Sequence, residues 1–270
     1  MSLLLTAVPS LDMRLPVGPV HRLIVAVDIE GSTERNNPAK GELRRILYEL
    51  LDRALDRAGI DSRHLEPYTD RGDSVLILIR PHDDVPKTLV LGQLIPVLTA
   101  LLAGHNASVP RPELRMRLRA VVHAGEVHED GNGFYGDDLD TAFRLLEAPR
   151  LKKALKEAAA SPLILVVSEE IFHGIVQQGY LDDGPYQPLV RVRVGRRQRR
   201  GWVHIPAPPR PDRPEGSRRP KGQLSPAPRA IGPVNGRGQD QPENHGAEPG
   251  ANGHRGLVVN GRAGPPPEPG

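Results

Sequence analysis

The stretch HRLIVAVDIEGST, residues 21–33, combines an apolar run that is typical of a buried strand with a polar turn. Its apolar, β-branched run ends in one carboxylate, Asp28, and Glu, Gly, Ser and Thr follow at once. Because strand interiors disfavour Asp, an Asp at this position indicates a ligand. Gly31, Ser32 and Thr33 come just before a predicted helix, where backbone N–H groups and hydroxyls suit a polyphosphate. The alternative is an Asx turn that only caps the helix.

The composition divides the chain into a foldable part and a polar remainder. From about Pro206 the sequence is rich in Pro, Gly and Arg and has no recurring apolar period, so we expect residues 207–270 to be a disordered tail. Residues 1–17 contain an apolar patch that is too short for a signal sequence or a membrane span, and we expect a flexible N-terminus there. Residues 18–206 remain, which is a usual length for one domain.

Charge and cysteine content limit the classes of function. The 270 residues carry a formal net charge of +3, and much of the Arg excess lies in the tail and in the run VRVRVGRRQRRG before it. Arg interspersed with Pro, Gly and Glu is typical of a solubilising linker and does not favour a nucleic-acid partner. The chain has no Cys, which excludes disulfides, thiolate metal sites and a Cys nucleophile. We expect a soluble, cytoplasmic protein without a membrane partner.

Periodicity predicts the order βαββαβ followed by an αβ extension. This order matches the ferredoxin-like split βαβ unit, an α+β fold in which one antiparallel sheet carries helices on one face. The segment 113–127 alternates in polarity and is expected to be a strand with one polar face. We expect strands at 23–29, 64–69, 74–80, 113–127 and 163–170, a final hairpin over 188–206, and helices at 36–60, 87–106 with a bend at Pro96, 137–148 and 169–180.

In such a sheet, strand 23–29 neighbours the hairpin 64–80, so the turn after Asp28 lies beside the turn RGDS that holds Asp73. Two carboxylates this close repel each other unless a cation lies between them, and hard divalent ions with oxygen ligands suit such a pair. Two ions about 3.5–4 Å apart would stabilise both the attacking and the leaving oxygen of a phosphoryl displacement. Simple turn chemistry is the alternative, because Gly-Asp is common at hairpin tips.

Four motifs in order resemble the catalytic domain of class III nucleotidyl cyclases, the adenylate and guanylate cyclase family: VAVDIEGST, RGDSVLILI, RLRAVVHAGEV and GFYGDDLDTAFRLLEA. The resemblance covers about residues 21–206. It implies a head-to-tail homodimer with active sites at the interface, a nucleoside triphosphate as substrate, and two Mg²⁺ or Mn²⁺ ions held by Asp28 and Asp73. The implied reaction forms a 3′,5′-cyclic nucleotide and pyrophosphate.

In the fourth motif the resemblance extends to single residues. Arg144 matches the arginine that steadies the triphosphate in the transition state, a role suited to a planar, permanently charged fork. A surface ion pair between Arg144 and Glu147 is the alternative. Asp140 stands where the family usually has the Asn that positions the ribose. Thr69 and Gly133 stand where the purine base is read, and they match neither the adenine nor the guanine pattern, so the base stays open.

Two further positions of the family bear on the mechanism. His123 matches a family position, but a His at a strand end is typically a packed structural residue, and we assign it no catalytic role. The family usually offers a Lys from its last strand pair; here the turn holds four arginines, one of which can substitute for it: Arg196, Arg197, Arg199 and Arg200. Two hypotheses follow, an active cyclase and a cyclase-like module that binds a nucleotide or a partner without turnover.

Overall fold

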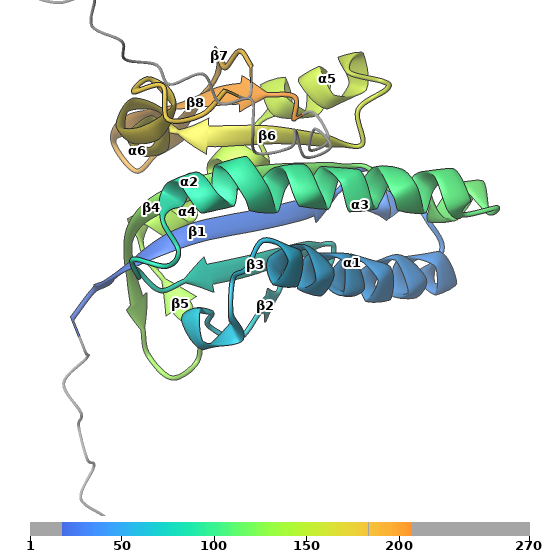
Figure 1. The fold of residues 1–270 in the computed structure, drawn as a ribbon, viewed down its shortest axis with the longest axis horizontal. Coiled ribbons are helices and arrows are strands. Elements are labelled where there is room, and N and C mark those ends of the chain that lie inside the picture. The colour runs from blue at the N-terminus through green and yellow to red at the C-terminus, as the bar shows by residue number, and fades with distance from the viewer. Residues whose placement is uncertain (1–17, 183, 207–270) are drawn as a thin grey trace, which may run out of the picture. The chain divides into compact units, whose positions relative to one another are not determined.

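The computed structural model describes residues 18–182 and 184–206. The expectations for residues 1–17 and 207–270 lie outside the described residues. The described part forms an eight-stranded sheet with helices packed on it (Figure 1). The strands are β1 (Val20–Ile29), β2 (Thr69–Asp70), β3 (Ser74–Ile79), β4 (Leu118–Glu129), β5 (Phe134–Tyr135), β6 (Leu163–Ser168), β7 (Gln187–Val194) and β8 (Arg197–His204). The helices are α1 (Asn37–Arg57), α2 (Lys87–Leu89), α3 (Ile95–Ser108), α4 (Asp137–Leu146), α5 (Pro149–Glu157) and α6 (Glu169–Ile171).

The strand β1 lies inside the sheet, between β3 and β4. The order along the sheet is β2-β3-β1-β4-β6-β8-β7, and β5 pairs with β4. β1 is antiparallel to both β3 and β4, whereas β4 and β6 are parallel. The parallel pair arises because α4 and α5 carry the chain back along the sheet between these two strands. The predicted α+β fold class is confirmed, with this one parallel pair in an otherwise antiparallel sheet.

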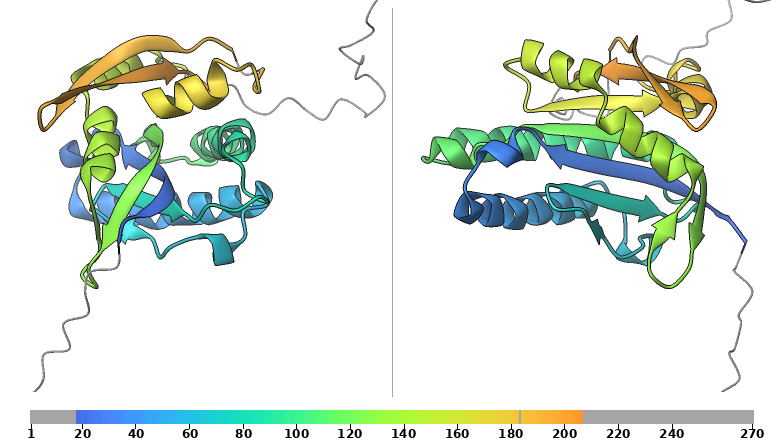
Figure 2. Two further views of the ribbon diagram at one scale, coloured as in Figure 1. Left: turned by 90° about the vertical axis from the view of Figure 1, so that its left-hand side faces the viewer. Right: turned by 180° about the vertical axis from the view of Figure 1, so that it is seen from behind.

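The helices cover both faces of the sheet, so the expectation of helices on one face is wrong. Val25 and Val27 of β1 pack in one core cluster with α1 and α3, whereas Ile24 and Ala26 pack in a second cluster with α4 and α5. Figure 2 shows α4 on the side of the sheet opposite α1 and α3. The apolar run of β1 has this composition because a strand covered on both faces has no solvent-facing side.

The strand β4 is also buried on both faces, contrary to its predicted polar face. Arg119 and His123 lie on the face that packs against α4, and both are buried. They tolerate burial because each side chain is engaged by polar groups of neighbouring elements, as described below. The predicted strand 113–127 is therefore confirmed only from Leu118 onward, because Pro112–Leu114 forms a 3₁₀ turn, and its predicted solvent exposure is wrong.

The two long helical segments show the cap and the irregularity that their sequences predict. Asn36 caps α1, because its side chain accepts a hydrogen bond from Ala39 N at 3.0 Å. The second segment runs from Lys87 to Ser108 with a π turn at Val90–Leu94 just before Pro96, which lacks the N–H that an α-helix needs at that place. The segment has 22 residues and contains an 18-residue window with a mean hydropathy of 1.6, so by length and composition it could span a membrane. They instead pack as a core helix against the sheet.

Candidate active site

The turn after β1 and the β2–β3 turn meet at one end of the sheet. Asp28 lies opposite Ser74 in the β1–β3 register, and Ile29 N donates a hydrogen bond to Asp73 O at 3.1 Å. The hydroxyl of Ser32 donates a hydrogen bond to the carboxylate of Asp73. The structure therefore places the two predicted metal ligands on adjoining segments, and Ser32 of the glycine-containing loop contacts Asp73.

Asp28 is buried and already carries two hydrogen-bond donors. Its side chain is on the α4 face of the sheet and the residue is only 7% exposed. Ser74 Oγ donates a hydrogen bond to Oδ1 at 2.8 Å, and the guanidinium of Arg119 forms an ion pair with Oδ2. The cation beside Asp28 in this structure is therefore the protein's own arginine.

Arg119 is a site residue that the sequence reasoning missed. It lies directly opposite Asp28 in the β1–β4 register and is 9% exposed. Burial lowers the pKa of its guanidinium, and a nearby Glu147 opposes that shift. Its Nε has no hydrogen-bond partner among the described residues. The antiparallel pairing of β1 with β4 could have identified Arg119, because residues directly opposite each other in such a pair have their side chains on the same face of the sheet.

The loop Gly31–Thr33 lies at the edge of an open hollow beside Asp73. Gly31 adopts a left-handed backbone conformation with φ 64°, and a single 3₁₀ turn, Ser32–Glu34, follows it. The hollow has a volume of about 660 Å³, within the range of roughly 300–1,000 Å³ usual for ligand pockets. Arg119 and two lysines of α5, Lys152 and Lys156, also line it. The sequence reasoning missed α5, although Pro149 and the spacing of Leu151 and Leu155 are typical of a short helix.

A second hollow is larger than the one beside Asp73, but its lining does not indicate a ligand site. A hollow of about 870 Å³ lies near the opposite end of α1 and is lined by groups that are paired with one another. The hydroxyl of Tyr68 donates to Asp52 at 2.8 Å, and Glu66 accepts hydrogen bonds from Arg22 and Arg80. These contacts explain the polar lining without a ligand.

Arg144 and Asp140 lie on the exposed side of α4. The residues of α4 that pack on the sheet are Leu139, Ala142, Leu145 and Leu146. Asp140 and Arg144 are one turn apart, away from this face, and both are exposed. Among the described residues Arg144 forms no ion pair, so the alternative pairing with Glu147 is absent there. Both side chains therefore project away from their own chain's sheet.

The two predicted base-reading positions are not neighbours within one chain. Thr69 is half-buried on β2, opposite Leu76 and close to the Asp73 turn. Gly133 lies in the β4–β5 turn with φ 145°, at the end of β4 away from Arg119. About ten residues of strand, or roughly 33 Å, separate Arg119 from that turn. A single chain does not bring Gly133 to Asp28.

The arginines of the final hairpin do not contact the Asp28 and Asp73 region within the chain. Arg196, Arg197 and Arg200 are exposed. Arg199 is half-buried, and its Nη1 lies 3.9 Å from Glu170 Oε1. None of the four lines the hollow beside Asp73. The predicted substitution of one of them for the family's Lys therefore depends on a second chain.

His123 occupies a buried polar network and not a cavity. It is 0% exposed; its Nδ1 is 2.8 Å from Ser168 Oγ and its Nε2 is 3.2 Å from Asp138 Oδ1. The hydrogen bond from His123, aided by one from Glu126 N, holds the pKa of Asp138 below its usual value. Gly125 makes room for this carboxylate, because a Cβ there would lie 2.2 Å from Asp138 Cγ. The network anchors α4 on β4.

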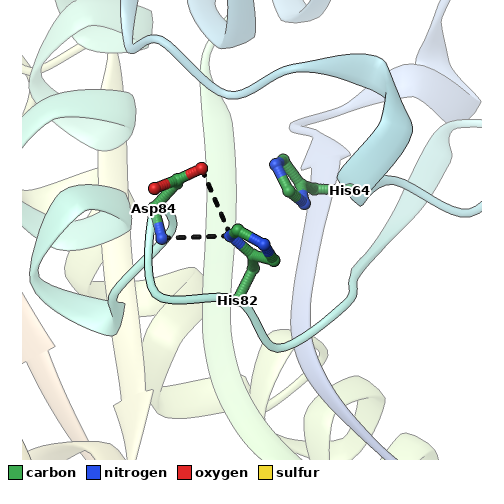
Figure 3. A group of neighbouring side chains, drawn as sticks. All are labelled: His64, His82 and Asp84. Atoms are coloured by element: carbon green, nitrogen blue, oxygen red, sulfur yellow. Dashed lines mark hydrogen bonds and ion pairs between the residues drawn. The ribbon is translucent and has the colours of Figure 1, made fainter.

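A second group of possible metal ligands lies elsewhere, at the end of β3 away from Asp28. Ligand atoms of His64, His82 and Asp84 lie within 4.8 Å of one another (Figure 3). His82 Nδ1 accepts a hydrogen bond from Asp84 N at 3.1 Å, and His64 Nε2 accepts one from Arg63 Nε at 3.2 Å. A neutral imidazole has one acceptor nitrogen, and here each ring already uses it. These protein contacts account for the group, and we assign no metal to it.

Comparisons with known proteins identify the fold. No protein-family model and no curated protein sequence matches the chain. The crystal structure of an adenylate/guanylate cyclase/hydrolase from Silicibacter pomeroyi is similar, with 19% identity, a TM-score of 0.50, and coverage of 70% of this chain and 99% of that one. The guanylyl cyclase Cya2 is also similar, with 14% identity, a TM-score of 0.48, and coverage of 69% of this chain and 93% of that one. The guanylate cyclase domain of RhGC from Catenaria anguillulae, solved with GTP, has 16% identity, a TM-score of 0.46, and coverage of 69% of this chain and 97% of that one. The described part of the chain therefore has the fold of an adenylate/guanylate cyclase catalytic domain.

Proposed function

We propose that the protein is a nucleotidyl cyclase that converts a nucleoside triphosphate to a 3′,5′-cyclic nucleotide and pyrophosphate. The observation that carries this proposal is the convergence at one end of the sheet of Asp28, Asp73 and the Gly31–Thr33 loop beside a basic hollow. Two carboxylates provide hard oxygen ligands, and the loop and hollow provide space and positive charge for a polyphosphate. The fold supports the same reaction class.

Asp28 and Asp73 are the residues that would hold two divalent cations. The donor set fits Mg²⁺ or Mn²⁺, because carboxylates on adjoining segments, with a serine hydroxyl next to them, are hard oxygen ligands. The ion pair with Arg119 shows that a positive charge is accommodated at Asp28 Oδ2. For a metal to bind there, Arg119 has to release that oxygen and turn its guanidinium toward the hollow, which it already lines.

The chemistry then divides between the ions and the chain. When bound, the ions would favour ionisation of the ribose 3′-hydroxyl and neutralise charge on the reacting phosphates. The chain itself would hold the polyphosphate at Gly31–Thr33 and near Arg119. Arg144 would stabilise the charge that develops during displacement at the α-phosphate, and Asp140 would accept a hydrogen bond from a ribose hydroxyl. No side-chain nucleophile is required.

The site would be completed by a second copy of the chain in a head-to-tail homodimer. Arg144 and Asp140 project away from their own sheet, and Gly133 lies far along β4 from Asp28. The proposal therefore assigns these residues to a nucleotide that Asp28 and Asp73 of another chain hold. A two-fold axis then gives two equal sites. The base that Thr69 and Gly133 would face is left open.

A second candidate is a cyclase-like module that binds a nucleotide or a partner without turnover. The Asp28–Arg119 ion pair favours it, because this pair removes the repulsion between the two carboxylates without any metal. Asp140, Thr69 and Gly133 also depart from the ribose and base readers of the family.

Incubation with each of the four nucleoside triphosphates and Mn²⁺, with pyrophosphate release as the readout, tests the proposal. We expect release from at least one nucleotide and its loss in Asp73→Ala. Tight nucleotide binding without release would replace the cyclase with the binding module. Equal release by wild type and Asp73→Ala would exclude the assigned metal site.

A further inference from the structure

We propose that Lys152 and Lys156 of α5 form the second wall of a polyphosphate cradle whose first wall is the Gly31–Thr33 loop of the same chain. This inference rests on the proposed function for its substrate, and it adds two phosphate-binding residues that the sequence motifs do not contain. The ligand class is a linear polyphosphate, either the triphosphate of a nucleotide or the pyrophosphate that leaves.

Lys152 and Lys156 have no anionic partner in the part of the chain that the structure describes. Both are exposed, both line the hollow, and neither forms an ion pair among the described residues. Lys153, between them in sequence, instead pairs with Glu157 at 3.6 Å. Lys152 and Lys156 are one helical turn apart, a spacing at which like charges repel. An anion held between them and the loop would turn this repulsion into attraction.

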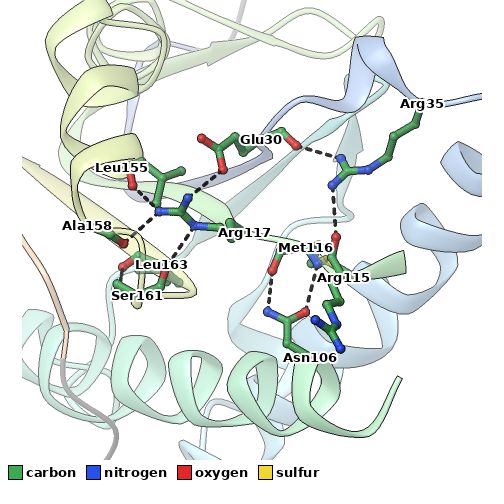
Figure 4. Close-up of polar contacts among 10 residues, drawn as sticks. All are labelled: Glu30, Arg35, Asn106, Arg115, Met116, Arg117, Leu155, Ala158, Ser161 and Leu163. Atoms are coloured by element: carbon green, nitrogen blue, oxygen red, sulfur yellow. Dashed lines mark hydrogen bonds and ion pairs between the residues drawn. The ribbon is translucent and has the colours of Figure 1, made fainter. Parts of the chain in front are cut away.

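Polar contacts fix the position of α5 relative to the loop. Arg117, one residue before β4, donates to the carbonyl oxygens of Leu155, Ala158 and Ser161 (Figure 4). The same guanidinium lies 3.3 Å from Glu30 Oε2, next to Gly31. One side chain thus joins the C-terminal end of α5 to the end of β1. The lysines are therefore held by a rigid helix and not by a free loop.

A buried, unpartnered donor of Arg119, which lines the same hollow, also indicates an anionic ligand. Arg119 Nε has no hydrogen-bond partner among the described residues, although Arg119 is 9% exposed and lines the hollow. Buried donors are normally paired, so this one is poised for an acceptor that the protein does not provide. Phosphate oxygens are such acceptors, and charge-assisted bonds to them are strong.

Other charges in the hollow do not cancel this basic character. Glu30 is paired with Arg117, and the carboxylate of Asp73 accepts from Ser32 and is assigned to a metal. Arg35 donates to the carbonyl oxygens of Glu30 and Arg115 and forms no ion pair within residues 18–182 and 184–206 (Figure 4). Glu34 remains as an exposed carboxylate at the rim.

Calorimetric titration of the full chain with inorganic tripolyphosphate and Mg²⁺ tests the inference apart from catalysis. We expect binding by the wild type, and about tenfold weaker binding by Lys152→Gln/Lys156→Gln because two charge-assisted contacts are lost. Lys153→Gln is the matched control and should bind within about twofold of wild type, since its charge faces Glu157. Lys152→Arg/Lys156→Arg should retain binding, and all variants should melt like the wild type.

The inference is overturned if the wild type does not bind tripolyphosphate, if the double Gln variant binds it as the wild type does, or if Lys153→Gln is equally weakened. Failure of the proposed function looks different. If no nucleotide is cyclised but the Lys-dependent binding of tripolyphosphate is present, the cradle stands and the cyclase assignment falls. If a nucleotide is cyclised and the double Gln variant binds and turns over normally, the cradle falls and the cyclase stands.

Discussion

Asp28→Ala should unfold the protein more easily even without any metal or nucleotide. The substitution leaves the guanidinium of Arg119 buried, 9% exposed, without its ion-pair partner; Glu147 is near but forms no ion pair with it, and its Nε has no hydrogen-bond partner among the described residues. Removing one partner of a buried ion pair costs about 3–5 kcal/mol of unfolding free energy. For a domain of this length that corresponds to a fall in melting temperature of roughly 6–20 °C. Ser74 also loses its acceptor.

Denaturant unfolding of a double-mutant cycle measures this effect. The variants are Asp28→Ala, Arg119→Met and the two combined, with Asp73→Ala as the matched control. Asp73 is half-exposed and accepts from Ser32, so its loss should cost only about 1 kcal/mol. The combined variant should be more stable than Asp28→Ala alone, because it no longer holds an unpaired buried charge. Equal losses in Asp28→Ala and Asp73→Ala, or additive losses in the combined variant, would refute the buried-pair reasoning.

Three further outcomes are expected. Gly125→Ala should destabilise the fold strongly, because its Cβ would lie 2.2 Å from Asp138 Cγ; an unchanged melting temperature would contradict the packing described there. His123 lowers the pKa of Asp138, so this carboxylate stabilises the fold above its unfolded pKa of about 3.9, and the stabilisation is lost as the pH falls through the folded pKa. The free energy of unfolding of Asp138→Asn should therefore fall less steeply with acid than that of the wild type. Parallel stability–pH curves for the two proteins would contradict this. Added Mn²⁺ should raise the melting temperature of the wild type more than that of Asp73→Ala, and equal shifts would count against metal binding at Asp73.

Local sequence was sufficient to predict β1, α1 and the β2–β3 turn. A buried apolar run, a capped amphipathic period and a Gly-Asp turn each depend on a few consecutive residues. The neighbouring positions of Asp28 and Asp73 then followed from the topology of the split βαβ unit. The fold class was predictable for the same reason.

Features that depend on distant pairing were not predictable. The contact between Arg119 and Asp28 requires the β1–β4 register, and neither residue's neighbours specify it. Helix α5 was missed because it is short and follows α4 almost directly. Because α5 was missed, the sequence analysis did not predict that helices cover the second face of the sheet. Leu151 and Leu155 of α5 help to fill the core on that face. Lys152 and Lys156 reach the hollow only because α5 exists.

Mixing two inactive chains is the most direct test of a shared active site. Asp73→Ala removes a proposed metal ligand, and Arg144→Ala removes the cation that is proposed to come from the other chain, so each variant alone should be inactive. In a mixed dimer one interface receives both defects and the other receives none. With random exchange about half of the dimers are mixed and each has one intact site, so about a quarter of wild-type pyrophosphate release should return. No recovery in a mixture shown to exchange subunits would contradict the account.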